Sequence, residues 1–177
     1  MKTIATSILI FAVTFVYGQE ILRFRITTPK AIYGPIVKTM TIDHSGKLDF
    51  DFYRKHFFTP YHYPQQMVDP NHKNDTVTIS NDTAKIGNFI NNWSYTITYD
   101  AQSRVTSYKY SPCMRCSQLP YHYYFFYNQL GQVIKIKNNL NEDNTIEFKY
   151  DTNGNIVSLK EYKFSDLRQE IELKSKK

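Results

Sequence analysis

The chain lacks the short sequence signatures of the common enzyme classes. It has no Gly-x-Ser-x-Gly elbow, no His-Glu-x-x-His pair, no phosphate-binding glycine loop and no dinucleotide-binding glycine fingerprint. Carboxylate pairs such as Asp49 and Asp51 alternate with apolar residues, here Leu48 and Phe50, which is typical of a solvated strand face rather than of a glycosidase. We therefore expect a protein that is not an enzyme, with no catalytic residue and no cofactor.

Long apolar segments are also missing, apart from one at the N-terminus. The chain begins MKTIATSILIFAVTFVYGQ, in which Lys2 precedes an apolar stretch. Val16 and Gly18 are small enough for the −3 and −1 positions of a cleavage site. The apolar stretch is shorter than the ~20 residues that a membrane-spanning helix needs. The sequence therefore predicts a signal peptide over residues 1–18, cleaved near Gly18, and a secreted, periplasmic or cell-surface protein without a membrane span.

Concentrated basic stretches are missing as well, although the net charge is +6. Lysine and arginine are scattered along the chain, except for Lys174, Lys176 and Lys177 at its end. A scattered surplus of positive charge favours solubility over nucleic-acid binding. We expect no nucleic-acid partner.

Alternating apolar and polar residues dominate what remains. This period of two runs through residues 22–26, 48–52, 93–99 and 146–150, and it indicates half-buried strands. The 15 tyrosines and 12 phenylalanines suit a sheet with one buried face, because tyrosine combines apolar area with a polar tip. The predicted fold class is all-β, an antiparallel meander of hairpins that could curl into a partial barrel or sandwich.

One domain over residues 19–177 accommodates these features. Residues 19–90 are less regular and contain a proline-rich segment, 54–75, which we interpret as a loop and a candidate binding segment. Residues 91–164 carry the clearest hairpin pattern. Residues 165–177 form a basic tail, in which Ser165 could cap a short helix, although a frayed strand or a disordered end fits equally well.

Three segments repeat the same pattern: YDAQSRV at 99–105, YNQLGQV at 127–133 and YDTNGNI at 150–156. Each has tyrosine first, aspartate or asparagine second, glycine or serine fifth and an aliphatic residue seventh. The positions that we expect to form the turns are Tyr99, Asp100, Tyr127, Asn128, Gly131, Tyr150, Asp151 and Gly154. An Asp or Asn side chain opens a turn by bonding the backbone ahead of it, and glycine accepts the positive φ that a hairpin turn requires. A weaker fourth copy is IDHSGKL at 42–48.

This pattern resembles the YD repeat of the RHS family, in which hairpins join edge to edge into long β-sheets. The resemblance covers residues 97–164 well and 42–53 weakly. It implies a sheet architecture and export, and it supplies no catalytic residues. Three or four hairpins are too few to enclose a cargo domain, as large members of that family do.

Both cysteines of the chain lie between two of the repeats, in the sequence Cys113-Met114-Arg115-Cys116. In an oxidising compartment, a disulfide between Cys113 and Cys116 is the first interpretation. A zinc site is an alternative, with Cys113, Cys116, His122 and His62 as candidate ligands. A thioredoxin-like redox role is a third possibility, although no helix pattern follows the motif.

Three functions fit the sequence. The first is binding of carbohydrate or a cell surface through a tyrosine-rich sheet face, because aromatic rings stack on sugars. The second is a structural or interaction module whose exposed sheet edge pairs with another protein. The third is a metal or redox protein built on Cys113 and Cys116.

The disulfide and the metal site predict different compositions of the purified protein. We expect no bound zinc, and a mass that rises by two hydrogens after reduction. Metal analysis with and without reductant, combined with intact-mass measurement, decides between the two. One zinc ion per chain would overturn the disulfide assignment.

Overall fold

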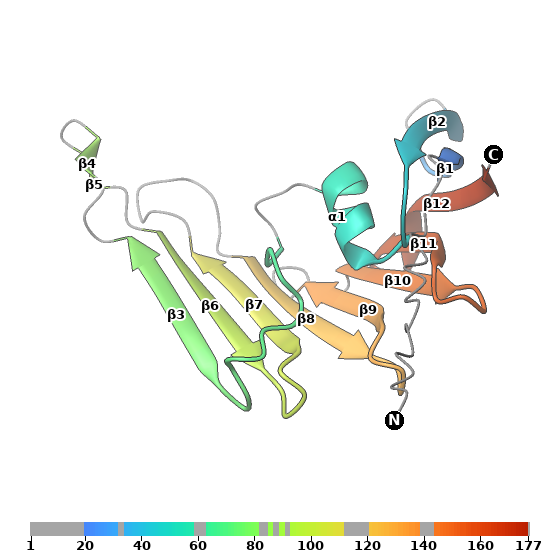
Figure 1. Cartoon of the computed structure of the whole chain (residues 1–177). Coiled ribbons are helices and arrows are strands. Elements are labelled where there is room, and N and C mark those ends of the chain that lie inside the picture. Colours follow the sequence, from blue (N-terminus) through green and yellow to red (C-terminus); the bar gives the residue numbers. More distant parts are fainter. Residues whose placement is uncertain are drawn as a thin grey trace, which may run out of the picture.

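A computed structural model describes residues 20–31, 34–58, 63–81, 85–86, 89–90, 93–111, 121–138 and 144–176. Most of these residues belong to one ten-stranded antiparallel sheet with the strand order β2-β1-β12-β11-β10-β9-β8-β7-β6-β3 (Figure 1). The predicted all-β class is confirmed. The sheet is not closed into a barrel, because β2 and β3 form two separate edges. No helix in the described part is long and apolar enough to cross a membrane.

The strands of the large sheet have the following bounds: β1 (Glu20–Thr28), β2 (Ile36–His44), β3 (Thr76–Asn81), β6 (Trp93–Tyr99), β7 (Val105–Ser111), β8 (Tyr121–Tyr127), β9 (Val133–Asn138), β10 (Asn144–Tyr150), β11 (Ile156–Lys163) and β12 (Asp166–Lys176). A separate two-stranded pair consists of β4 (Lys85–Ile86) and β5 (Phe89–Ile90). One helix, α1 (Phe50–Phe57), connects the N-terminal hairpin to the rest of the chain.

The strands from β6 to β12 follow one another as a meander, each pairing with the next along the chain. The hairpin of β1 and β2 joins this meander at its far end, where β1 pairs with β12. Strand β3 joins at the opposite end, where it pairs with β6 along all six of its residues. The N-terminal part of the chain therefore supplies both edges of the sheet.

The core lies on one side of the sheet, which we call the inner face, where α1 packs (Figure 1). Alternate residues of each strand point to this face, as the period of two requires. One inner row runs across four strands through Phe148, Leu159, Ile171 and Ile26. The opposite side, the outer face, carries mainly threonine, lysine and glutamate.

The strand predicted over residues 48–52 is wrong, because α1 begins at Phe50. Asp49 lies just before the helix, and its Oδ1 accepts a hydrogen bond from the amide of Phe52 at 3.1 Å. This is the arrangement of an N-cap, which satisfies an amide that the first helical turn leaves unpaired. Phe50, Tyr53 and Phe57 follow a helical spacing and face the sheet from one side of α1. The alternation of Leu48, Phe50 and Phe52 is too short to distinguish a strand from this helix.

Of the alternatives left open for residues 165–177, a short helix, a frayed strand or a disordered end, the described part forms a strand, β12. The turn from β11 consists of Phe164 and Ser165, with φ of 51° and 64°. These positive values match a two-residue hairpin turn, so Ser165 does not cap a helix. Ile171 is buried between β1 and β11, and this burial holds the strand in place.

Candidate functional site

The three predicted turns share one hydrogen-bonding pattern. In each turn, the side-chain Oδ1 of Asp100, Asn128 or Asp151 accepts from the amides two and four residues ahead. The bonds to Asp100 measure 2.9 and 2.9 Å, those to Asn128 3.0 and 3.0 Å, and those to Asp151 2.9 and 2.8 Å. One side chain therefore fixes the path of the whole turn, as the sequence predicts.

The fifth position of each turn has the left-handed backbone conformation that the repeat requires. The values of φ are 62° at Ser103, 75° at Gly131 and 76° at Gly154. A β-bulge lies next to the first tyrosine of each turn. Gly131 and Gly154 thus sit in reversals between adjacent antiparallel strands. Ser103 adopts the same conformation at the energetic cost of a side chain.

The weak fourth copy at residues 42–48 does not form a hairpin. Strand β2 continues to His44, Gly46 has a φ of 118°, and the chain then enters α1. Leu48 lies against the last turn instead, where its carbonyl accepts from the amide of Ile156 at 2.7 Å. The segment therefore packs against a repeat rather than forming one.

Tyrosine hydroxyls link each turn to its neighbour. Tyr127 donates to the carbonyl of Val105 at 2.6 Å, and Tyr150 donates to the carbonyl of Val133 at 2.7 Å. In both cases the tyrosine of one repeat bonds the seventh residue of the preceding repeat. Tyr53 of α1 continues the series by donating to the carbonyl of Ile156 at 2.9 Å, so the helix takes the place of a further repeat.

Burial raises the pKa of Tyr53, Tyr127 and Tyr150 well above the usual value for tyrosine. The hydroxyls therefore stay protonated and remain donors across the physiological pH range. Removing one of them leaves a carbonyl at a buried turn without its partner.

The first turn is covered by part of the segment predicted to be a loop. The amide of Val105 donates to the carbonyl of Met67 at 2.9 Å, and the amide of Asp69 donates to the carbonyl of Ser103 at 3.0 Å. The ring of His72 stacks on Tyr99 with a centroid separation of 5.2 Å. Residues 67–72 are thus packed against the sheet and do not form a free binding loop.

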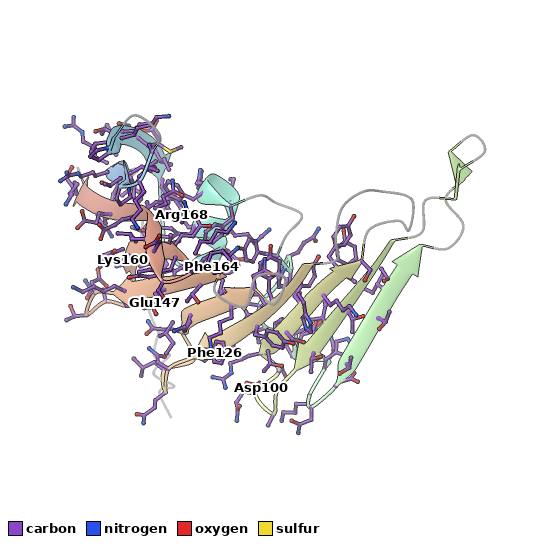
Figure 2. The ribbon with its side chains drawn as sticks, turned by 180° about the vertical axis from the view of Figure 1, so that it is seen from behind. Asp100, Phe126, Glu147, Lys160, Phe164 and Arg168 are labelled. Atoms are coloured by element: carbon purple, nitrogen blue, oxygen red, sulfur yellow. The ribbon has the colours of Figure 1, made fainter. Side chains whose placement is uncertain are left out.

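Charge reinforces the same turn. Asp100 pairs with Arg104 at 2.7 Å, and the Arg104 guanidinium lies 4.5 Å from the centroid of the Tyr127 ring. Burial alone would raise the pKa of Asp100, but hydrogen bonds from Arg104 lower that pKa below its usual value. Figure 2 shows Asp100 at the turn end of the sheet.

The proposed metal and disulfide residues are not brought together by the described structure. Cys113, Cys116 and His62 lie outside the described residues, so the disulfide and the zinc site stay predictions. His122 lies on the outer face of β8, where its Nδ1 is 3.3 Å from the hydroxyl of Tyr124. Burial, together with the charge of Lys109, lowers the pKa of His122.

The tyrosine-rich sheet face is the core of the protein. Nine tyrosines of the described part are buried in the core or pack against it: Tyr53, Tyr63, Tyr95, Tyr99, Tyr108, Tyr110, Tyr123, Tyr127 and Tyr150. Among the tyrosines whose side chains the structure describes, Tyr124 and Tyr162 lie outside this set. The aromatic face that the sequence offered for stacking on sugars is therefore largely closed to a ligand.

The outer face carries paired polar side chains. Lys135 pairs with Glu147 at 3.1 Å and Lys160 with Glu170 at 3.4 Å, forming a row of alternating charge across four strands. Figure 2 shows Glu147 and Lys160 on this side of the molecule. Opposite charges therefore neutralise one another along this row.

Strand β3 forms an edge whose backbone groups alternate between β6 and the open side. The amide of Tyr99 donates to the carbonyl of Asp75 at 2.8 Å, which sets the phase of the antiparallel ladder. By the alternation of such ladders, Val77 and Ile79 bond to β6, whereas the amide and carbonyl groups of Thr78 and Ser80 face outward. The amide of Thr76 is occupied by the Asp75 carboxylate at 2.7 Å.

The two edges of the sheet differ in their protection. Edge strands usually carry charges, proline or a bulge that discourage pairing with other chains. Strand β2 contains Lys38 and Asp43. Strand β3, with the sequence TVTISN, contains no charge and no proline, pairs with β6 without a bulge, and leaves Ile79 52% exposed.

We predict that Tyr150→Phe lowers the free energy of unfolding by about 1–2 kcal/mol, because it leaves the carbonyl of Val133 without its donor. Urea unfolding measures this difference. Tyr162→Phe on the outer face is the matched control, and it should change stability by less than about 0.5 kcal/mol. Equal effects of the two substitutions would show that the hydroxyl-to-carbonyl bond contributes nothing.

Comparison with known proteins finds no relative of this chain. No protein-family model matches it, and neither a curated protein nor a solved structure matches it. The function must therefore be argued from the geometry of the chain itself.

Proposed function

We propose that this chain is an exported, non-enzymatic interaction module that binds an extended segment of another protein along the edge of β3. Such binding adds one strand to the sheet through main-chain hydrogen bonds, and side chains on alternate positions provide selectivity. The single observation that carries the proposal is the outer edge of β3, which pairs with no strand of the described part and carries no charge and no proline.

The side chains of β3 define the partner that fits. Thr76 and Thr78 form hydroxyl pairs with Thr98 and Thr96 on the outer face, at 3.3 and 3.2 Å. Val77 packs against the core on the inner face, and Ile79, two residues further along the same face of β3, is exposed. An incoming strand with hydroxyl residues on one face and β-branched residues on the other would continue both rows.

The rest of the molecule supports a rigid edge. The meander behind β3 is fixed by its side-chain-anchored turns, so β3 is held in an extended conformation before any partner arrives. Because β3 is already ordered, binding of a partner costs less conformational entropy. The resemblance to the YD repeat agrees with this proposal, because those repeats also extend sheets edge to edge.

Carbohydrate binding through the tyrosine face is the weaker candidate, because nine tyrosines lie in or against the core. The metal or redox function depends on Cys113 and Cys116, and composition analysis tests it independently.

We predict that a peptide carrying the β6 sequence, WSYTITY, flanked by lysines for solubility, binds β3 from its open side. This peptide is a suitable probe because β6 already pairs with β3 residue by residue. In the NMR spectrum of the full chain, the amides of Thr78 and Ser80 should shift and become protected from exchange when the peptide is added. Protection elsewhere, without protection at Thr78 and Ser80, would contradict the proposal.

Thr78→Pro should abolish this binding and leave the fold intact, because the lost amide faces outward and proline is tolerated at such edge positions. Thr78→Val keeps the amide and is the matched control. Thr78→Lys provides a second blocking variant that keeps the backbone unchanged. Unchanged peptide binding by both Thr78→Pro and Thr78→Lys would overturn the proposed function.

A further inference from the structure

A pocket of about 510 Å³ lies beside α1, at the opposite end of the molecule from β3. Its volume is within the range of small-ligand sites. The residues that line it come from the end of β2, the connection that follows and the exposed side of α1: His44, Lys47, Asp49, Asp51, Phe52, Arg54, Lys55 and His56. None of them belongs to the repeat turns or to the β3 edge.

Ring contacts with Phe52 hold the two histidines of the pocket in place. The ring of Phe52 contacts both imidazoles in tilted geometry, with centroid separations of 4.5 Å to His44 and 4.7 Å to His56. Phe52 itself is buried against the core, so it is a fixed support for both imidazoles. The Nε2 atom of His44 is also 3.4 Å from the carbonyl of Lys47, which ties the connection to β2.

The acidic residues of the pocket are already engaged by neighbours. Asp49 accepts from the amide of Phe52 as the cap of α1, and Asp51 accepts from Nε of Arg54 at 3.3 Å. Arg54 also donates to the carbonyl of Gln65 at 3.3 Å. Both carboxylates and the one guanidinium of the pocket are therefore occupied by partners within the chain.

Two lysines remain. Within the described residues, neither Lys47 nor Lys55 has an ion pair. The pocket thus offers two ammonium groups and two imidazoles, whereas its carboxylates are engaged by the amide of Phe52 and by Arg54. Its positive character is also visible at His56, whose pKa is lowered by burial and then by the charges of Lys55 and His44.

We propose that this pocket binds a small acidic ligand, a carboxylate or a phosphate ester, through Lys47 and Lys55. Ammonium groups form strong charge-assisted hydrogen bonds with both kinds of oxyanion. A neutral ligand would leave the two lysines unpaired, and a cationic ligand would be repelled. The pocket volume of about 510 Å³ leaves room for a group of monosaccharide size in addition to the oxyanion.

Isothermal titration of the full chain with glucuronate, glucose 6-phosphate, inorganic phosphate and glucose tests the proposal. We expect at least one acidic probe to bind and glucose not to bind. Tighter binding of glucuronate than of glucose 6-phosphate would assign the site to carboxylates, and the reverse order would assign it to phosphate esters. Binding of inorganic phosphate as tight as that of the sugar phosphate would assign it to the free anion. Binding of glucose as tight as that of either sugar acid would overturn the proposal.

Substitution of the lysines locates the binding. Lys47→Gln combined with Lys55→Gln should weaken binding of the acidic probe by about tenfold or more. Lys109→Gln combined with Lys149→Gln removes the same charge from the outer face and should leave the affinity unchanged. Binding should also raise the pKa of His56, measured by NMR, because a nearby anion stabilises the imidazolium. Equal loss of affinity in the two double variants would show that only net charge matters and would contradict a site at α1.

Discussion

The structure depends on one hydrogen-bonding arrangement, in which a single Asp or Asn side chain fixes a complete chain reversal. The oxygen of Asp100, Asn128 or Asp151 accepts from two amides of its own turn, so the backbone cannot take another path without losing both bonds. The left-handed residue that follows completes the reversal. Each turn thereby sets the register of its two strands, and the register decides which side chains face the core.

Tyrosine hydroxyls convert these separate turns into a continuous array. Because Tyr127 and Tyr150 each bond the preceding repeat, no turn is independent of its neighbour. The series of tyrosine bonds ends at α1, where the hydroxyl of Tyr53 donates to the carbonyl of Ile156. At the other end the array continues into β6 and β3, where no equivalent cap lies along the open edge within the described part. The asymmetry between a capped end and an open edge is what leads us to place the interaction surface at β3.

Much of the repeat region could be predicted from the sequence because its information is local. The side-chain oxygen, the glycine and the flanking tyrosine lie within seven residues of one another, so the turn positions follow from residue types alone. The helix over 50–57 was missed because Leu48, Phe50 and Phe52 also satisfy a period of two, and only the cap at Asp49 and the longer spacing to Phe57 favour a helix. The choice between a helix and a strand for residues 165–177 stayed open for a different reason, since the pairing of β12 with β1 joins residues from opposite ends of the chain.

The functional surfaces were harder to predict because they, too, depend on contacts between residues that are far apart in the sequence. A strand is an edge strand when one of its sides has no neighbouring strand, which depends on the whole topology. The sequence TVTISN therefore gives no local indication that β3 is the last strand. The pocket beside α1 depends on which charges are already engaged, and the engagement of Arg54 by the carbonyl of Gln65 is set by the tertiary fold. Tyrosine content suits either a buried sheet face or an exposed binding face, and the structure places nine of these rings in or against the core.

The central claim is that the turns impose the left-handed conformation on their fifth residue, and Ser103 tests it most directly. Ser103 stands where the other two turns have glycine. Its φ of 62° is energetically unfavourable for a residue with a side chain. The free energy of unfolding of Ser103→Gly, measured in urea, should exceed that of the natural chain by about 0.5–1 kcal/mol. A decrease on this substitution would contradict the account, because it would mean that the turn does not require a positive φ at this position.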